Sequence, residues 1–196
     1  SAMSTSEARR RAPHAAYLAG RFDAYRQSSR IVMALLREYS PVVEPLSLDE
    51  AYVDLAAGGI ATDDLHALAQ LIADLRAEMT RRTEGLSASV GVGSSKLIAK
   101  LASEQAKPDG HLIVASGSEL QMITDLPVRA VPGVGPATME RLLRLGIATV
   151  ADLQRASEKE LVRELGSAAG AALHEMAFAR DDREVQATRE VKSISV

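Results

Sequence analysis

The sequence predicts an α+β domain followed by a small all-α module. Up to residue 114, segments with helical periodicity alternate with short segments typical of strands, which favours helices packed on a sheet. After residue 116, prolines and glycines separate short helices, and no segment is typical of a strand until the end of the chain. A chain of 196 residues is long enough for two such small domains.

The first domain is expected to hold helices at 21–39, at 63–82, and from Ser94 or Ser95 to just before Pro108. The expected strands are 42–48, 51–55, 86–92 and 111–114. The first two helices each carry one apolar stripe, running from Tyr25 to Tyr39 and from Leu65 to Met79, so both should pack on the same face of the sheet. A split βαβ sheet would also need a strand before residue 21. Either another connection exists, or the chain has been cut from something longer.

Composition restricts the chemistry that the chain can perform. With no cysteine, disulfides and thiolate metal sites are excluded, so any metal needs oxygen or imidazole ligands. A net charge of −3 does not indicate nucleic-acid binding, which usually leaves a basic footprint. No apolar run approaches the roughly 20 residues of a membrane span, and the start, SAMSTSEARRRAP, has no apolar signal region. We therefore expect a cytoplasmic protein without membrane contact.

An acidic pair, Asp49-Glu50, lies where two predicted strands meet. Neighbouring side chains in a strand point to opposite faces, but at a hairpin tip two carboxylates can converge. Convergent carboxylates repel each other unless a cation lies between them, and Mg²⁺ favours such hard oxygen ligands. From the dipeptide alone, an ordinary polar turn is the favoured interpretation.

Residues 89–110, SVGVGSSKLIAKLASEQAKPDG, run from a predicted strand through Gly91-Val92-Gly93 into a helix. This resembles a phosphate cradle, because helix N-termini present free N–H groups, although the spacing matches neither the P-loop nor the Rossmann motif. Lys96 and Lys100 are four residues apart and share a helix face, and Lys107 follows the helix. From spacing alone, a solvated lysine face is the favoured interpretation.

Residues 131–147, VPGVGPATMERLLRLGI, contain a glycine-rich turn that leads into a helix beginning near Pro136. The turn residues Gly133, Val134 and Gly135 leave backbone N–H groups uncovered near a helix start, which can hold a phosphate without side-chain charge. The order of residues favours a helix–hairpin–helix DNA clamp over a plain turn between two helices.

Taken together, these stretches resemble the Y-family (translesion) DNA polymerases of the bacterial DNA polymerase IV type. EPLSLDEAYVDL resembles the second catalytic motif of the family, and SVGVGSSKLIAKLASEQAKPDG resembles the block that ends in its triphosphate lysine. VPGVGPATMERLLRLGIATVADL resembles the thumb's helix–hairpin–helix, and REVKSISV the start of the tether to the little finger. The matches occur in family order over nearly the whole chain.

The resemblance implies a division of the chain. It assigns residues 1–20 to the tail of the fingers, 21–116 to a partial palm without its first strand, 117–181 to an all-α thumb, and 182–196 to a linker toward an absent little-finger domain. It also implies template-directed nucleotidyl transfer from a deoxynucleoside triphosphate to the 3′-hydroxyl of a primer–template DNA.

The same resemblance implies roles for single residues. Asp49 matches the aspartate that ligates both catalytic Mg²⁺ ions, for which Mn²⁺ can substitute, and Glu50 matches the glutamate on the metal that activates the primer hydroxyl. Lys107 matches the lysine that contacts the incoming nucleotide. Gly133, Val134 and Gly135 match the hairpin that holds the DNA backbone.

The first catalytic motif of the family, with another metal-binding aspartate, would lie before this chain, so we expect the chain to be inactive alone. Any sliding-clamp contact would lie outside it as well. One alternative is a non-catalytic DNA-binding module with a helix–hairpin–helix and a decayed palm. Another is a nucleotide-cyclase-like palm, against which the thumb motif argues.

Overall fold

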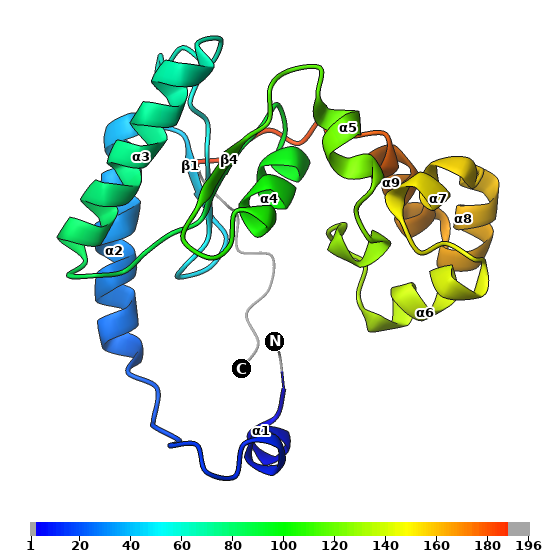
Figure 1. Ribbon diagram of the computed structural model, residues 1–196, viewed down its shortest axis with the longest axis horizontal. Coiled ribbons are helices and arrows are strands. Elements are labelled where there is room, and N and C mark those ends of the chain that lie inside the picture. Colours follow the sequence, from blue (N-terminus) through cyan, green and yellow to red (C-terminus); the bar gives the residue numbers. More distant parts are fainter. Residues whose placement is uncertain (1–2, 188–196) are drawn as a thin grey trace.

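A computed structural model describes residues 3–187, whose elements form two groups lying next to each other along the long axis (Figure 1). We call residues 22–116 the strand-containing half and residues 117–181 the helical half. The first contains α2 (Phe22–Tyr39), β1 (Val43–Pro45), β2 (Ala51–Val53), α3 (Leu65–Arg82), β3 (Val90–Val92), α4 (Lys96–Gln105) and β4 (His111–Ile113). The second contains α5 (Glu119–Thr124), a 3₁₀ helix (Val128–Ala130), α6 (Pro136–Arg144), α7 (Val150–Arg155), α8 (Glu158–Leu165) and α9 (Ser167–Ala177). The predicted α+β class is confirmed.

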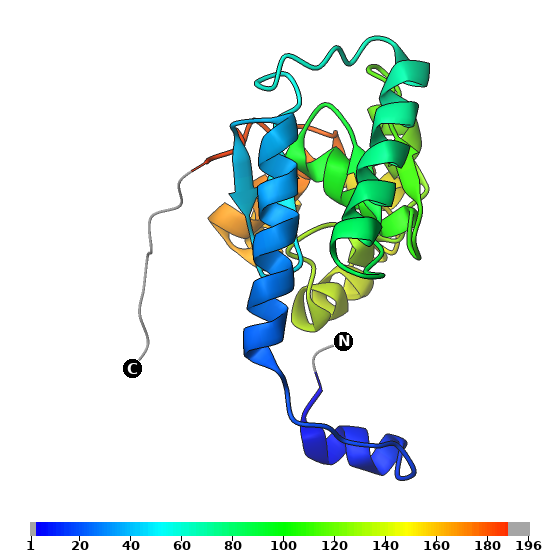
Figure 2. The same ribbon diagram turned by 90° about the vertical axis from the view of Figure 1, so that its left-hand side faces the viewer.

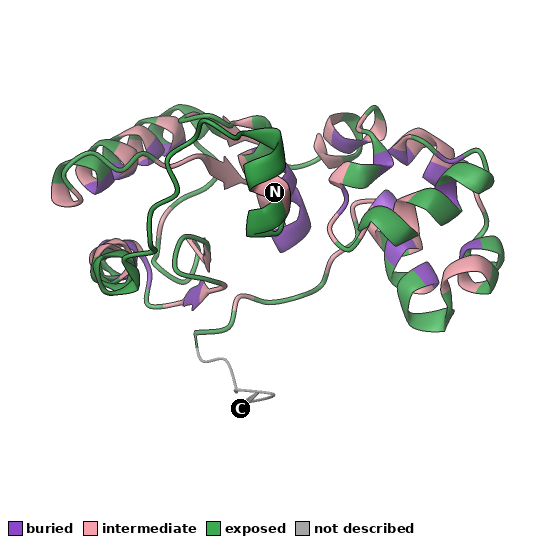
Figure 3. Ribbon diagram, turned by 90° about the horizontal axis from the view of Figure 1, so that it is seen from below, coloured by how far each residue is buried: buried purple, intermediate pink, exposed green. Residues whose placement is uncertain are grey.

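The first helix, α1 (Thr5–Arg11), stands apart from both halves (Figure 1 and Figure 2). It has no buried residue, whereas both halves contain buried positions (Figure 3). Nothing in residues 3–187 forms a helix long and apolar enough to cross a membrane.

The strands form two separate pairs within the described part of the chain, whereas we expected one sheet. β1 and β2 are antiparallel, with Val43 opposite Val53, and β3 and β4 are parallel, with Val90 opposite His111. All four predicted strands exist, but each is only three residues long. The hairpin closes early because the N–H groups of Leu46 and Ser47 both donate to the carbonyl oxygen of Glu50.

Helices α2 and α3 lie side by side against the strands, as predicted (Figure 1 and Figure 2). Asp64 caps α3 by accepting hydrogen bonds from the N–H groups of His66 and Ala67, both at 3.0 Å. The predicted stripes extend too far, because Tyr25 is 45% and Leu65 is 46% exposed. Each lies in the first turn of its helix, and the start of α2 runs past the ends of the strands (Figure 1).

The helical half contains no strand, as predicted. It has a single isolated bridge between Pro127 and Thr149. Helices α8 and α9 pack so closely that a Cβ atom on Gly170 would lie 2.4 Å from the backbone nitrogen of Val162. Glycine is therefore needed at the end of the first turn of α9, despite its low helix propensity.

Helix α4 connects the two halves. Its apolar side chains Leu97, Ile98 and Leu101 are at most 2% exposed and belong to the same apolar cluster as the core of the helical half. A second cluster lies between α2, α3 and the strands. The composition of the chain changes near residue 116, but the apolar packing continues from α4 into the helices that follow.

After α9, residues 178–187 run back from the helical half to the strands, and we call them the return segment (Figure 1). Asp181 accepts a hydrogen bond from the N–H of Leu97 at 2.8 Å, and the N–H of Gln186 donates to Glu44 Oε2 at 2.9 Å. The start of the predicted linker is thus bound to the strand-containing half. The rest of it, residues 188–196, lies outside the described residues.

A buried ion pair joins these elements. Lys96 Nζ donates to Glu44 Oε2, and the two side chains are only 8% and 10% exposed. The Lys96 ammonium also lies 5.4 Å from the centre of the Tyr52 ring, a cation–π contact. The pair links the first strand, the start of α4 and, through Glu44, the return segment.

We expect Lys96→Met to lower the free energy of unfolding by about 3–5 kcal/mol, because Glu44 then loses its buried cation. Lys100→Met is the matched control, since it removes the same side chain one turn later, where it is more exposed, and should cost at most about 1 kcal/mol. Urea denaturation followed by circular dichroism measures both. Equal losses in the two variants would contradict the structural role of the Glu44–Lys96 pair.

Candidate active site and nucleic-acid interface

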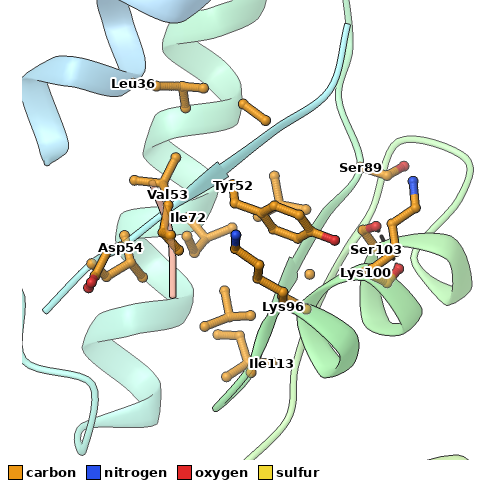
Figure 4. A pocket seen from close by; sticks show the side chains of 18 of the residues that line it. Leu36, Tyr52, Val53, Asp54, Ile72, Ser89, Lys96, Lys100, Ser103 and Ile113 are labelled. Carbon is orange, nitrogen blue, oxygen red and sulfur yellow. Dashed lines mark hydrogen bonds between the residues drawn. The ribbon is translucent and has the colours of Figure 1, made fainter. Parts of the chain in front are cut away.

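A cavity of about 930 Å³ lies between β2 and β3, bordered by α3, α4 and the return segment. Apolar side chains, including Leu36, Val53 and Ile72, cover one side of it (Figure 4). Tyr52 and Lys100 lie on the other side, toward α4 (Figure 4). The predicted acidic pair and Lys107 also line this cavity. The structure therefore brings three predicted site residues to one place.

The acidic pair lies at the tip of the β1–β2 hairpin, and both carboxylates are exposed. Asp49 Oδ1 accepts a hydrogen bond from the Ser47 hydroxyl at 2.6 Å. Glu50 Oε1 instead accepts a hydrogen bond from Lys100 Nζ at 2.6 Å. The two neighbouring carboxylates thus have different partners, one within the turn and one on α4.

The donor set at this tip fits a hard divalent cation. Asp49 and Glu50 offer carboxylate oxygens, and Mg²⁺ is commonly bound by one or two carboxylates together with substrate phosphates. The contact between Glu50 and Lys100 shows that a positive group is already accommodated beside that carboxylate. Over residues 3–187, no cluster of three or more His, Cys, Asp or Glu side chains is placed to hold a metal. The hairpin therefore offers two carboxylates, fewer than the three side chains of such a cluster.

Four side chains of alternating charge extend from the hairpin along α4, and we call Glu50, Lys100, Glu104 and Lys107 the charge line. Lys107 Nζ donates to Glu104 Oε1 at 2.7 Å, and Lys100 Nζ lies 3.6 Å from the same oxygen. Lys107, the predicted nucleotide ligand, is thus paired within the chain. The charge line connects it to the acidic pair.

The pKa values along the charge line reflect these contacts. The hydrogen bond from Lys107 holds the pKa of Glu104 below its usual value, although burial opposes this. Burial lowers the pKa of Lys100, but its hydrogen bond to Glu50 and the charges of Glu50 and Glu104 outweigh burial and raise it. Both groups are therefore charged at neutral pH.

The start of α4 lacks the open backbone of the phosphate cradle that its sequence resembles. A Cβ atom on Gly91 would lie 2.1 Å from the carbonyl oxygen of Ala99, so this glycine lets β3 pack directly on α4. The Ser95 side chain and the Asp181 carboxylate accept hydrogen bonds from the first N–H groups of α4. A carboxylate from the chain itself thus lies where such a cradle would hold a phosphate.

The solvated lysine face was also only partly correct, because Lys96 is buried whereas Lys100 is partly exposed. Glu44 and Tyr52, the two partners of Lys96, were not among the residues predicted for the site. One signal was present, since Glu44 is the one charged residue of the predicted strand 42–48. A buried carboxylate usually requires a cation close to it.

The turn before α6 has the open backbone that a phosphate contact needs. Gly133 adopts a φ of +89°, which favours glycine, and Gly135 is the N-cap of α6. A Cβ atom on either glycine would meet nothing within 4 Å. Gly133 and Gly135 were both expected to donate their N–H groups to a phosphate. The N–H of Gly135 already donates to the carbonyl oxygen of Gly133 at 3.1 Å. In the first turn of α6, Ala137 and Thr138 supply further N–H groups.

Comparisons with known proteins identify the class to which this fold and site belong. The impB/mucB/samB family model matches residues 1–104, more than half of the 196 residues, and the model of the DNA polymerase-iota thumb domain matches residues 129–180. The chain therefore belongs to the impB/mucB/samB family. The resemblance to Y-family DNA polymerases is confirmed.

Among particular relatives, DNA polymerase IV of Streptomyces coelicolor is 55% identical over 196 residues, which are 100% of this chain and 40% of that protein. DNA polymerase IV of Alkalilimnicola ehrlichii is 44% identical over 99% of this chain and 53% of its own length. The insertion ternary complex of Dbh DNA polymerase superimposes with a TM-score of 0.83 at 26% identity, covering 93% of this chain and 52% of that one. The chain thus spans about half the length of the relatives it matches.

We expect stability to fall below pH 3.8 partly through Asp181. Burial raises the pKa of this carboxyl, but hydrogen bonds from Arg183 and from the N–H of Leu97 outweigh burial and leave it below its ordinary value of 3.8. A carboxyl with a lowered pKa in the folded state stabilises the fold above its unfolded pKa and loses this contribution as pH falls through the folded pKa. Asp181→Asn should therefore cost about 1–2 kcal/mol at pH 7, and less below pH 3.8.

Urea unfolding at pH 7 and at pH 3 measures this difference. Asp182→Asn changes the neighbouring exposed carboxyl and serves as the control, with no loss expected at either pH. A loss for Asp181→Asn that stays constant with pH would contradict the assigned role of the charge.

Proposed function

We propose that this chain is the palm and thumb part of a template-directed DNA polymerase of the translesion type, which transfers a nucleotidyl group to a primer 3′-hydroxyl. The observation that carries the proposal is the gathering of Asp49, Glu50 and Lys107 at one cavity, joined by the charge line. The relatives named DNA polymerase IV support it.

The proposed division assigns residues 1–20 to the tail of the fingers, 21–116 to the palm, 117–181 to the thumb and 182–196 to a linker toward a little-finger domain. The detached position of α1 and the purely helical second half support these boundaries (Figure 1). The apolar packing of α4 against the helical half would fix the thumb on the palm. In a bacterial cell the primer–template DNA lies in the cytoplasm. We therefore place this protein in the cytoplasm too.

Asp49 and Glu50 would hold Mg²⁺ at the hairpin tip, and Mn²⁺ could take its place. When bound, two such ions lower the pKa of the attacking hydroxyl and neutralise the charge that develops on the leaving phosphates. Asp49 would give up its hydrogen bond from Ser47, and Glu50 its contact with Lys100, to become ligands. Lys107 would then add a point charge to the triphosphate.

The helix–hairpin–helix would hold the DNA backbone at Gly133, Val134 and Gly135. Contacts from main-chain N–H groups neutralise phosphate charge locally without reading bases, which suits a polymerase that copies any template. They also need no basic side chains. This fits a chain with a net charge of −3.

DNA polymerisation would need residues that do not belong to this 196-residue chain. β2 and β3 each have one strand partner among residues 3–187 and border the cavity between them, where a further strand would fit. The partial ligand set at the hairpin supports the same view, since an additional carboxylate would complete it. A sliding clamp, if the parent protein uses one, would bind outside this chain.

Primer extension tests the catalytic assignment in the full-length parent protein. We expect Asp49→Ala to reduce extension with Mg²⁺ at least about 100-fold, because a metal ion contributes several kcal/mol of charge stabilisation. Asp63→Ala, at an exposed carboxylate before α3, is the control and should extend primers normally. We expect the isolated 196-residue chain to extend none.

An active Asp49→Ala enzyme would refute the metal assignment. Extension by the isolated chain would refute the requirement for further ligands. DNA binding by a full-length protein that never extends primers under any metal would favour the non-catalytic DNA-binding module instead.

Gly135→Val tests the proposed DNA clamp. Gly135 has a φ of −79°, which any L-residue adopts, and open space at its Cβ position, so the fold should tolerate the change. The added side chain would instead block close approach of a DNA backbone. Affinity for duplex DNA at low salt should fall about tenfold, in line with the 1–2 kcal/mol that loss of charge-assisted hydrogen bonds implies.

Fluorescence anisotropy with a labelled duplex measures the affinity. Ala169→Val adds similar bulk at an exposed position of α9 and should leave binding unchanged. Equal affinities for Gly135→Val and the wild type would rule out the hairpin as a contact.

A further inference from the structure

One carboxylate oxygen in the charge line faces two ammonium groups. Glu104 Oε1 accepts a hydrogen bond from Lys107 at 2.7 Å, while Lys100 Nζ stands 3.6 Å away. Lys100 is held at that distance by its shorter contact of 2.6 Å with Glu50. Glu104 therefore accepts a hydrogen bond from Lys107. A movement of less than 1 Å would bring Lys100 within hydrogen-bond distance of the same oxygen.

The elements that carry these residues limit where each ammonium can go. Lys100 and Glu104 are one turn apart on α4, so they share a face. Glu50 comes from the hairpin, and Lys107 follows the end of α4. Lys100 thus has two carboxylates within reach, one on each side, and Lys107 is paired with Glu104.

We propose that Glu104 is a positioning residue that couples cation binding at Glu50 to the release of Lys107 for a triphosphate. The inference rests on the proposed function, because it takes Glu50 as a metal ligand and Lys107 as a nucleotide ligand. In the metal-free chain, Lys100 neutralises Glu50 and Glu104 retains Lys107.

The coupling follows from charge alone. Once Glu50 is engaged by a divalent cation, the Lys100 ammonium loses its main partner and is repelled by the new positive charge. The nearest remaining carboxylate oxygen is Glu104 Oε1. When Lys100 shares that oxygen, the charge that held Lys107 is partly neutralised. Lys107 then becomes available at the cavity edge, where a polyphosphate would meet it.

Site-resolved acetylation of lysines in the 196-residue chain tests the proposal, with Mn²⁺ as the probe. Trace acetic anhydride and peptide mass spectrometry report how readily each lysine reacts, and a paired ammonium reacts slowly. Mn²⁺ should increase the acetylation of Lys107 about two- to fivefold, the range set by the strength of an exposed ion pair. Exposed Lys159, on α8, is the internal reference and should not change.

The variants separate coupling from nonspecific effects. In Glu104→Gln, Lys107 should react rapidly without Mn²⁺, and Mn²⁺ should add nothing. Lys100→Met should abolish the response to Mn²⁺ as well. Glu140→Gln removes the partner of Arg144 on α6 and is the matched control, in which the response should persist.

Broadening of backbone amide signals by paramagnetic Mn²⁺ shows independently where the ion binds. Broadening at Asp49 and Glu50 without a change at Lys107 would overturn the coupling and leave the proposed metal site standing. A Glu104→Gln variant that still responds would also overturn it. If neither amide broadens at millimolar Mn²⁺, the metal site and the coupling both fail.

Discussion

The buried ion pair between Glu44 and Lys96 is the contact on which the arrangement of the site depends. Glu44 lies on the first strand of the hairpin that carries Asp49 and Glu50, and Lys96 is the first residue of α4. Pairing them holds the hairpin against the start of that helix. Lys100, one turn further along the same face, consequently meets Glu50. The return segment adds a backbone contact to Glu44 and thereby ties the exit of the helical half to the same point.

This arrangement gathers positive groups beside the cavity although the chain has a net charge of −3. Lys96, Lys100 and Lys107, which lie on or just after α4, are each held against a carboxylate. Each lysine of the charge line is restrained by a carboxylate, which under the proposed function a metal ion or a triphosphate would displace. The proposed DNA contact also needs no basic side chain. The turn before α6 offers main-chain N–H groups at two glycines with open space around them.

Sequence patterns predicted most helices and all strand locations, because these depend on local periodicity and on capping residues such as Asp64 and Ser95. They overestimated strand lengths, since a strand extends only as far as its partner does. They also left the role of Gly91 open. A glycine between a strand and a helix can hold a phosphate or allow close packing of the two elements. A Cβ atom on Gly91 would lie 2.1 Å from the carbonyl oxygen of Ala99 on α4, so here the glycine allows close packing.

The sequence by itself determined the α+β class, the order of the elements and the residue types of the candidate site, because motifs and periodicity are properties of neighbouring residues. The acidic pair, Lys107 and the glycine turn were all visible in it. Only the tertiary structure decided the partners: Glu44 is 52 residues from Lys96, and Glu50 is 50 residues from Lys100. Contacts across such separations depend on how the hairpin docks on α4. The docking is set by burial and ion pairing between distant segments, which no local pattern encodes.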